Sequence, residues 1–252
     1  MCIRDRQCAA TTTGAKDVVE RPYVHVTDNT VMNAWIFREA MRTSVGHLLF
    51  PSCTVMYQPR EYPQSETDWS PLDEIYSAYF GVGNMKVFCE KMCEFYSRIG
   101  TTKFTAFRHS NVYGPYDKFD LDKCHVVPAF VNKVINAEDT LEIWGQGNAS
   151  RDIIYIDDLI DFIDKCIQNQ DTKYELYNCG AGQAYPILQL AKCIMELNNK
   201  DLQFKFDLTK PDIPTTVILD CSKAKDQLGW SPKIDVTEGL RRTSEWYKEN
   251  VR

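Results

Sequence analysis

Apolar positions along this chain recur at two spacings, which predict strands and helices in alternation. The segment HLLFPSCTVMY at 47–57 has the continuous apolar core of a buried strand, followed by small hydroxyl and thiol residues. Apolar residues recur at helical spacing over residues 28–41 and 82–99. Other strands are predicted at 103–110, 141–144, 152–156, 202–206 and 216–219, and other helices from Pro128, at 159–168, at 186–198 and at 237–250. This alternation implies a mainly parallel α/β sheet with crossover connections.

Short polar side chains are expected to cap several of these helices. Residues 28–30, Asp-Asn-Thr, offer N-cap oxygens to the first helix, and Asp157 with Asp158 offers them to the helix at 159–168. Asp220 is expected to cap a short helix that follows it. Residues 1–14 are typical of the end of a strand and its loop. The sequence shows no internal repeat or flexible linker, so its 252 residues fit one large domain or two small ones.

Composition and charge exclude several functional classes. With 44% apolar and 25% charged residues and a formal charge of −6, the chain has ordinary globular composition and no long basic run. A nucleic-acid binder is therefore not expected. Apolar stretches fall short of the roughly 20 residues that span a bilayer, and no signal peptide is recognised, so we expect no membrane contact and a cytoplasmic location.

The ten cysteines are expected to be reduced thiols that pack as small apolar residues. They form no CxxC pair and no Cys/His group at zinc spacing, so no metal site is predicted. Cys89 and Cys93 share one face of the predicted helix at 82–99. Cys53 differs from the others because it follows a buried strand, where parallel sheets place functional side chains.

Several segments resemble the extended short-chain dehydrogenase/reductase family of nucleotide-sugar epimerases, reductases and dehydratases. The matching stretches include CAATTTG at 8–14, LLFPSCTVMY at 48–57, NVYGPYDKFD at 111–120, HVVPAFV at 125–131 and WGQGNASRDIIYIDDL at 144–159. They occur in family order and cover nearly the whole chain. The resemblance implies a Rossmann-type parallel sheet with a small C-terminal α/β substrate domain.

The resemblance also implies domain limits and a missing motif. Residues 1–114, with 150–168 and part of 212–222, correspond to the dinucleotide-binding domain, and 115–252 mainly to the nucleotide-sugar domain. Family members begin with a strand, a GxxGxxG turn and a helix that hold the dinucleotide pyrophosphate. This sequence has no such motif. Gly81-Val82-Gly83 is the nearest glycine pair, but it precedes the long predicted helix that matches the family's active-site helix, so it is not the GxxGxxG turn. We therefore expect a partial Rossmann sheet that lacks its first βαβαβ unit, in an N-terminally truncated chain.

The family's reaction uses a Tyr and a Lys four residues later, together with a Ser or Thr at a strand end, to move a proton at the reacting sugar oxygen. Lys86 matches the Lys, but Val82 stands four residues earlier. Either Tyr79 supplies the hydroxyl group, or the acid position is empty. At the strand end, Cys53 is the aligned residue and Thr54 the better hydrogen bonder; strand alternation would point them to opposite sides.

The resemblance assigns roles to residues of the second half as well. His125 aligns with a histidine that acts as an acid in family members that epimerise a sugar. Asn111, Arg151 and Lys133 are expected to contact the substrate's diphosphate or base. Ala9, Ala10, Ser52 and Lys86 are expected to contact NAD or NADP, with binding impaired by the missing Gly-rich turn.

Together these residues predict an NAD(P)-dependent nucleotide-sugar epimerase or reductase that transfers hydride at a sugar carbon, with little activity in this chain. The alternative is a non-catalytic nucleotide-sugar-binding or scaffold protein with a degenerate site. The family also pairs two helices, here about 30–42 and 82–99, in a homodimer interface. Exposed Trp35, Phe37 or Phe88 would fit that interface, whereas burial within the monomer would explain the same apolar residues.

Overall fold

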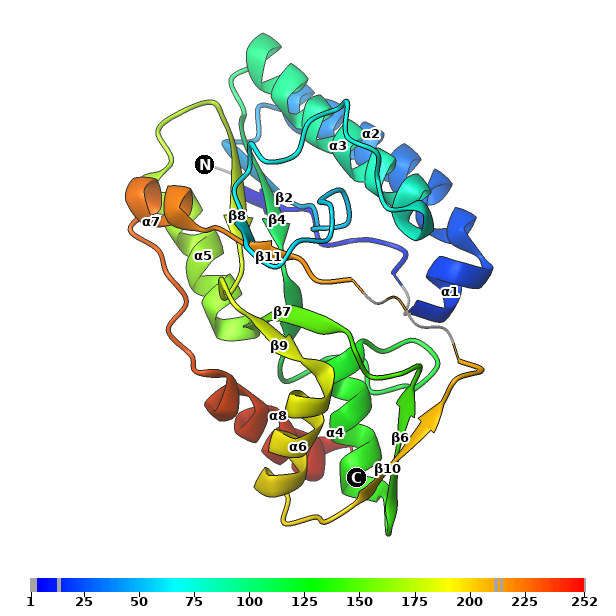
Figure 1. The fold of residues 1–252 in the computed structure, drawn as a ribbon. Coiled ribbons are helices and arrows are strands. Elements are labelled where there is room, and N and C mark those ends of the chain that lie inside the picture. The colour runs from blue at the N-terminus through cyan, green and yellow to red at the C-terminus, as the bar shows by residue number, and fades with distance from the viewer. Residues whose placement is uncertain (1–3, 13–14, 211–212, 214, 252) are drawn as a thin grey trace.

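A parallel sheet forms the upper part of the molecule in the computed structural model, which describes residues 4–12, 15–210, 213 and 215–251 (Figure 1). Its strands β1 (Arg4–Arg6), β2 (His47–Pro51), β4 (Lys103–His109) and β8 (Tyr174–Cys179) pair in that order. All three pairings are parallel. The carboxyl ends of these strands therefore lie at one edge of the sheet, which is where open α/β sheets bind ligands.

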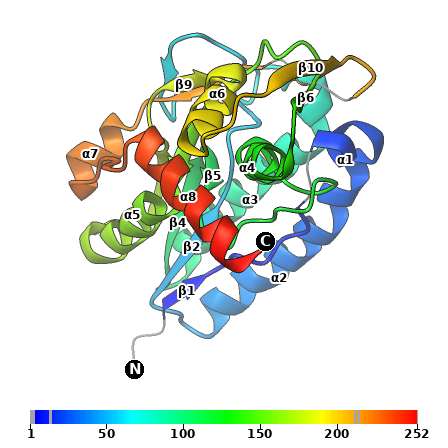
Figure 2. The ribbon, with the colours of Figure 1, turned by 90° about the horizontal axis from the view of Figure 1, so that it is seen from below.

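Helices cover both faces of this sheet. On one face α2 (Thr27–Arg42) and α3 (Phe80–Ile99) lie side by side, as Figures 1 and 2 show. On the other face lie α5 (Ile156–Asn169) and α7 (Ser222–Leu228). Leu48 and Phe50 of β2 pack toward α2 and α3, while Leu49 packs toward α5. The continuous apolar run of β2 is thus explained by burial on both faces.

A second group of elements forms the lower part of the molecule (Figure 1). Helices α4 (Val126–Asn136), α6 (Ile187–Leu197) and α8 (Val236–Asn250) share one apolar core. Around them lie the parallel pair β6 (Thr140–Trp144) and β10 (Gln203–Asp207), and the sheet of β5 (Asn111–Tyr113), β7 (Ser150–Tyr155) and β9 (Ala184–Pro186). Helix α8 approaches β5 so closely that a Cβ on Gly239 would lie 2.2 Å from the Tyr113 hydroxyl.

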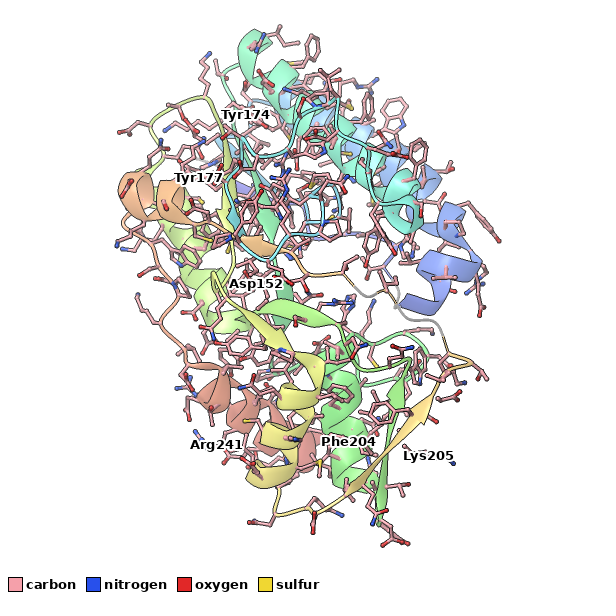
Figure 3. All side chains as sticks on the ribbon, in the orientation of Figure 1. Asp152, Tyr174, Tyr177, Phe204, Lys205 and Arg241 are labelled. Atoms are coloured by element: carbon pink, nitrogen blue, oxygen red, sulfur yellow. The ribbon has the colours of Figure 1, made fainter. Side chains whose placement is uncertain are left out.

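Short elements complete the described chain. They are α1 (Ala15–Glu20), the 3₁₀ turns η1 (Pro22–His25) and η2 (Ser77–Tyr79), and the parallel pair β3 (Pro63–Gln64) and β11 (Ile218–Leu219). Figure 3 labels Asp152 near the middle of the molecule, between Tyr177 of the upper part and Phe204 of the lower part. The Asp152 carboxylate accepts backbone N–H bonds from Ala181 at 2.9 Å and Leu219 at 3.1 Å, so it ties β7 to the loop after β8 and to β11.

The predicted α/β class and parallel sheet are confirmed, but two predicted helix caps are wrong. Helix α5 begins at Ile156, so Asp158 lies inside its first turn; its carboxylate instead accepts the N–H groups of Lys233 and Ile234 at 2.9 and 3.0 Å. Helix α2 begins at Thr27 with no side-chain cap bond at its N-cap residue. Asn29, one of the expected caps of α2, instead accepts the Thr11 N–H at Oδ1, at 2.9 Å, so Asp158 and Asn29 are both held by residues outside their own helices.

The buried-strand core predicted within 47–57 is β2, which ends at Pro51, so the small residues after it lie outside the strand. Strand β8 was missed, because its sequence YELYNC mixes polar and apolar residues without a clear period. Strand β8 lies within the predicted substrate region, yet it pairs with β4 in the main sheet. The domain limits near residue 114 stay a prediction.

The face formed by α2 and α3 is apolar and partly exposed. Trp35 and Phe88 are 54% and 50% exposed, whereas Phe37 is fully buried. The expectation that Phe37 could be exposed is therefore wrong, because its ring packs edge-to-face on Phe50 and Phe104. No helix in the described part of the chain has the length and apolar character needed to cross a membrane.

Candidate functional site

A cavity of about 830 Å³ opens at the carboxyl ends of β2 and β4. Its upper wall comes from the loop after β2, the segment after β4, and α3; its lower wall comes from the start of α4, β6 and β7. A concave site of this size is large enough for a small-molecule ligand. It is lined by most of the residues predicted from sequence, namely Ser52, Cys53, Thr54, Tyr79, Lys86, Asn111, His125, Lys133 and Arg151.

The loop after β2 brings Cys53 and Thr54 to the cavity together. Strand alternation had placed these two side chains on opposite sides, but the strand ends at Pro51, and a turn closed by the Tyr57 N–H on the Thr54 carbonyl follows at once. Ser52 is fully buried, and its hydroxyl donates to Glu90 at 2.6 Å. The bond between Ser52 and Glu90 therefore fixes the start of this loop, and the loop presents a thiol and a hydroxyl group to the cavity.

Lys86 connects α3 to this loop. Its Nζ donates to the Pro51 carbonyl at 2.9 Å and lies 4.9 Å from the centre of the Phe50 ring. Burial raises the pKa of the Cys53 thiol, and the positive charge of Lys86 partly opposes that effect. Cys53 is thus a neutral thiol beside a lysine at neutral pH.

Tyr79 immediately precedes α3 as its N-cap residue, and Val82 lies in the first turn. Both side chains line the cavity. Burial raises the pKa of the Tyr79 hydroxyl, while Arg151 acts in the opposite direction. The structure thus places a tyrosine hydroxyl in the cavity, and its role in proton transfer stays a prediction.

On the lower wall, His125 and Lys133 belong to the start and the body of α4. Burial lowers the pKa of the His125 imidazole, and the positive charge of Lys118 lowers it further. Lys133 donates to Glu142 Oε1 at 3.1 Å, and its Nζ lies 5.3 Å from the centre of the Trp144 ring. This wall therefore combines an imidazole, a paired cation and an indole face.

Arg151 and Asn111 bond to backbone carbonyls. Arg151 Nη2 donates to the Ile213 carbonyl at 2.8 Å, and Nη1 donates to the Thr215 carbonyl. Asn111 Nδ2 donates to the Asp152 carbonyl at 3.1 Å. In this state the two side chains shape the cavity wall, and contact with a ligand stays a prediction.

Ala9 and Ala10 follow β1 and are exposed. The Ala9 carbonyl accepts a bond from Gln7 Nε2 at 3.1 Å. Neither alanine is among the described residues that line the cavity. Their predicted contact with a dinucleotide remains untested.

Sequence reasoning missed three cavity-lining residues, His25, His109 and Trp144. His109 is the last residue of β4, so the strand-end rule that singled out Cys53 could have found it. Trp144 ends β6, and the Nζ atoms of Lys133 and Lys210 lie 5.3 and 5.5 Å from its ring centre. His25 lies in η1, a short turn that neither periodicity nor a motif indicated.

Beneath the site lies a buried ion pair. Arg108 Nη2 contacts Glu90 Oε2 at 2.8 Å, and Arg108 Nε contacts Oε1 at 3.1 Å. Only 2% of the Arg108 side chain and 4% of the Glu90 side chain are exposed. Because Glu90 also accepts the Ser52 hydroxyl bond, the pair fixes the start of the loop after β2.

Within the described residues, no group of three or more His, Cys, Asp or Glu side chains could hold a metal ion. The cavity is instead lined by cations, including Lys86, Lys118 and Lys133, against the carboxylates of Asp117 and Glu142. Glu142 and Lys133 neutralise each other, but Lys86, Lys118 and Arg151 still outnumber Asp117, so the balance of charge favours an anionic ligand.

Comparison with known proteins identifies the family. Residues 7–180 match the NAD dependent epimerase/dehydratase family, which is more than half of the chain. The chain therefore belongs to this family. This confirms the resemblance read from the motifs.

The relatives that are similar in sequence include the following two. The GDP-L-colitose synthase of Yersinia pseudotuberculosis is 29% identical over 235 residues, covering 91% of this chain and 76% of the relative. The putative GDP-L-fucose synthase 2 of Arabidopsis thaliana is 31% identical over 225 residues, covering 86% of this chain and 66% of the relative.

Solved structures share the fold. A UDP-glucose 4-epimerase from Thermotoga maritima, crystallised with UDP-glucose, superposes with a TM-score of 0.84 at 25% identity, covering 99% of this chain and 78% of that one. A GDP-6-OMe-4-keto-L-xylo-heptose reductase from C. jejuni gives a TM-score of 0.87 at 23% identity, over 98% of this chain and 82% of that one, and shows the fold alone.

Proposed function

We propose that this member of the NAD dependent epimerase/dehydratase family is a nucleotide-sugar epimerase or reductase that acts by hydride transfer at a sugar carbon. The observation that carries the proposal is the single cavity in which Cys53, Thr54, Lys86 and His125 come together. These residues reach it from three separate elements, as a built site requires. The names of the similar GDP-sugar and UDP-sugar enzymes support the substrate class.

The lower wall is proposed to bind the nucleotide diphosphate. Lys133 and Arg151 line it, and Asn111, two residues after His109 in the segment that follows β4, adds an amide where the upper wall adjoins it. Arginine and lysine suit phosphate oxygens because their N–H groups form charge-assisted hydrogen bonds. For Arg151 to reach a ligand directly, it must exchange its bonds to the Ile213 and Thr215 carbonyls. We therefore propose that Arg151 holds the backbone at Ile213 and Thr215 in place and also contacts the ligand.

The upper wall is proposed to hold the nicotinamide half of NAD or NADP. Val55, Val82 and Val112 make this wall apolar, with Lys86 beside them, which fits a flat ring attached to a ribose. Ser52, Lys86, Ala9 and Ala10 are the residues proposed to hold the cofactor, which when bound donates or accepts the hydride. The sequence has no GxxGxxG turn, so we propose that the pyrophosphate is held weakly and that the chain has little activity.

Proton transfer is proposed for groups on both walls. The Cys53 thiol and the Thr54 hydroxyl face the cavity near Lys86, where they can hold a sugar oxygen. The Tyr79 hydroxyl and the His125 imidazole are the groups that could give or take a proton. Burial raises the pKa of Tyr79 above its ordinary value near 10, so at pH 7 its hydroxyl carries the proton and can only give one up.

A non-catalytic nucleotide-sugar-binding protein is the second candidate. Val82 stands where the family's active-site tyrosine is expected, and Cys53 where a Ser or Thr is expected. A protein of this kind would keep the cationic lower wall that binds the nucleotide sugar, but its upper wall would not support hydride or proton transfer. We also propose a homodimer through the exposed α2 and α3 face, which carries Trp35 and Phe88.

Two binding measurements and one activity assay test these proposals. Fluorescence titration with NADH and NADPH is expected to show weak binding that Lys86→Met removes. Lys91→Met is the matched control, because Lys91 lies on the same helix, is exposed, and pairs only with Glu94 in the described structure. Unchanged NADPH binding in Lys86→Met would contradict the proposed cofactor wall.

Calorimetric titration with GDP- and UDP-sugars then tests the lower wall, and absorbance at 340 nm with GDP- and UDP-ketosugars plus NADPH tests turnover. Sugar-nucleotide binding that Lys133→Met weakens supports the substrate class. Binding at saturating NADPH without any oxidation favours the non-catalytic candidate. If no nucleotide sugar binds, the proposed function is wrong.

A further inference from the structure

Three of the four histidines in the sequence line one cavity. His25, His109 and His125 come from η1, the end of β4 and the start of α4. The fourth, His47, begins β2 at the opposite edge of the sheet and bonds to Thr105 at 2.7 Å. Histidine is the side chain whose charge changes most readily near neutral pH. The cavity therefore concentrates groups that can exchange protons with a ligand.

The hydrogen bond of His109 fixes which of its ring nitrogens can take a proton. Nδ1 lies 2.8 Å from the Ser110 carbonyl oxygen. A carbonyl only accepts, so Nδ1 carries the hydrogen, and the neutral ring has its lone pair on Nε2. The side chain is partly exposed to the cavity. Nε2 is thus the atom that can gain a proton.

The titratable groups that line the cavity together with His109 are mainly cationic or neutral. Lys86 comes from α3, His125 from the start of α4, Lys118 and Asp117 from the loop before it, His25 from η1, and Cys53 from the loop after β2. Burial, followed by the charges of Lys86 and His125, lowers the pKa of His109 to about 4. Burial raises the pKa of Asp117, the only carboxylate among the groups just named. Without a ligand, His109 is neutral at pH 7.

We propose that His109 is a proton-accepting part of an anion site, and that it takes up one proton at Nε2 when the diphosphate of a ligand enters the cavity. The inference rests on the proposed function for the class of ligand. Protonation turns a hydrogen-bond acceptor into a second N–H donor that faces the anion, and it offsets the cost of burying the negative charge. Ligand binding and proton uptake are therefore coupled.

Coulomb's law shows that the coupling is large enough. At an effective dielectric constant of about 20, each negative charge held about 5 Å away raises a histidine pKa by roughly 2 units. A nucleotide-sugar diphosphate carries two such charges, which is enough to bring His109 from about 4 to near neutral. Affinity should then increase as the pH falls from 8 toward 5, by at most about tenfold for each pH unit, since one proton is taken up.

Histidine NMR provides the direct test. The Cε1–H signals of a ¹³C-histidine-labelled chain are titrated from pH 4 to 8, alone and with saturating GDP-mannose, whose diphosphate does not titrate in that range. His109→Gln, His125→Gln and His25→Gln assign the signals, and His47 serves as an internal reference. We expect the His109 pKa to rise by at least about 2.5 units in the complex, which is the rise that a fivefold change in Kd between pH 8 and 6 requires, and the His47 signal to be unaffected by the ligand. A His109 pKa that is equal with and without ligand would overturn the inference.

The pH dependence of affinity tests the same coupling without NMR. The Kd for GDP-mannose should fall at least fivefold from pH 8 to pH 6 in the wild type, and less than twofold in His109→Gln. An equal pH dependence in both proteins overturns the inference, even if the nucleotide sugar binds tightly.

Inorganic pyrophosphate separates this inference from the proposed function. If neither GDP-mannose nor UDP-glucose binds at any pH, the proposed function fails, and the NMR titration is repeated with pyrophosphate. A rise in the His109 pKa with pyrophosphate supports the anion site, and no rise refutes it.

Discussion

Removing the positive charge of Arg108 is expected to destabilise the fold strongly. Its guanidinium makes two hydrogen bonds to Glu90, at 2.8 and 3.1 Å, and one to the Glu66 carbonyl at 3.2 Å. Arg108→Met keeps a side chain of similar length but leaves the Glu90 carboxylate, 4% exposed, with only the Ser52 hydroxyl as a hydrogen-bond partner among the described residues. A buried carboxylate without its counter-charge is costly because water cannot replace the lost partner.

The magnitude follows from those contacts. Charge-assisted hydrogen bonds contribute about 1.5–3 kcal/mol each, so the two bonds to Glu90 give roughly 3–6 kcal/mol. Breaking one side of a buried ion pair typically costs about 3–5 kcal/mol, which agrees with that sum. We therefore expect Arg108→Met to lower the free energy of unfolding by about 3–5 kcal/mol, a large share of the roughly 5–15 kcal/mol of a typical domain.

Urea unfolding at pH 7, followed by circular dichroism, measures this change. The matched control is Arg98→Met, which removes an exposed arginine paired with Glu94 on α3 and is expected to cost less than about 1 kcal/mol. The double variant Arg108→Met/Glu90→Leu should recover at least about 2 kcal/mol relative to the sum of the single changes, because no unpaired charge remains. A cost of Arg108→Met similar to that of the control would refute the reasoning.

Three further changes have defined outcomes. Gly239→Ala should cost about 1–3 kcal/mol in urea unfolding, because the new Cβ would lie 2.2 Å from the Tyr113 hydroxyl; unchanged stability would contradict the close packing of α8 on β5. Burial raises the pKa of Asp152 to about 6, so folding favours its protonated form. Its contribution to the free energy of unfolding is therefore fully present below about pH 4 and is lost as the pH rises through 6. The loss is about 3 kcal/mol at 1.4 kcal/mol per pKa unit, and Asp152→Asn should remove that slope between pH 4 and 6, which parallel urea titrations of the two proteins would reveal. Trp35→Glu should convert a dimer to a monomer in light scattering, whereas Phe206→Glu, on the exposed strand β10, should not; a wild type that is monomeric at micromolar concentration contradicts the proposed interface.

The predicted elements were most accurate where apolar spacing was regular. The helix predicted at 82–99 is α3, Phe80–Ile99, and the strand predicted at 103–110 is β4, Lys103–His109. Prediction failed where a distant contact decided the local structure. Asp158 does not cap α5, because its carboxylate is held by the N–H groups of Lys233 and Ile234, far along the chain. Helix ends and short strands depend on such contacts more than on local preference.

The candidate site was predictable in its residue types and in part of its geometry. The rule that ligands bind at the carboxyl ends of parallel strands singled out Cys53 and its neighbours from sequence. The same rule would have indicated His109, but no motif drew attention to it. The position of Tyr79 could not be derived, because it depends on where α3 begins, and the structure places that start at Phe80.

The sequence by itself determined the parallel α/β class, the elements with clear periodicity, and the family to which the chain belongs. These follow from hydrophobic spacing and from motif order, which are properties of neighbouring residues. Only the tertiary structure decided that Cys53 and Thr54 share a cavity, that Ser52 is held by Glu90, and that three histidines meet among cations. The reason is physical: burial, charge and hydrogen-bond partners arise from segments far apart in the chain, and they set the chemistry of each side chain.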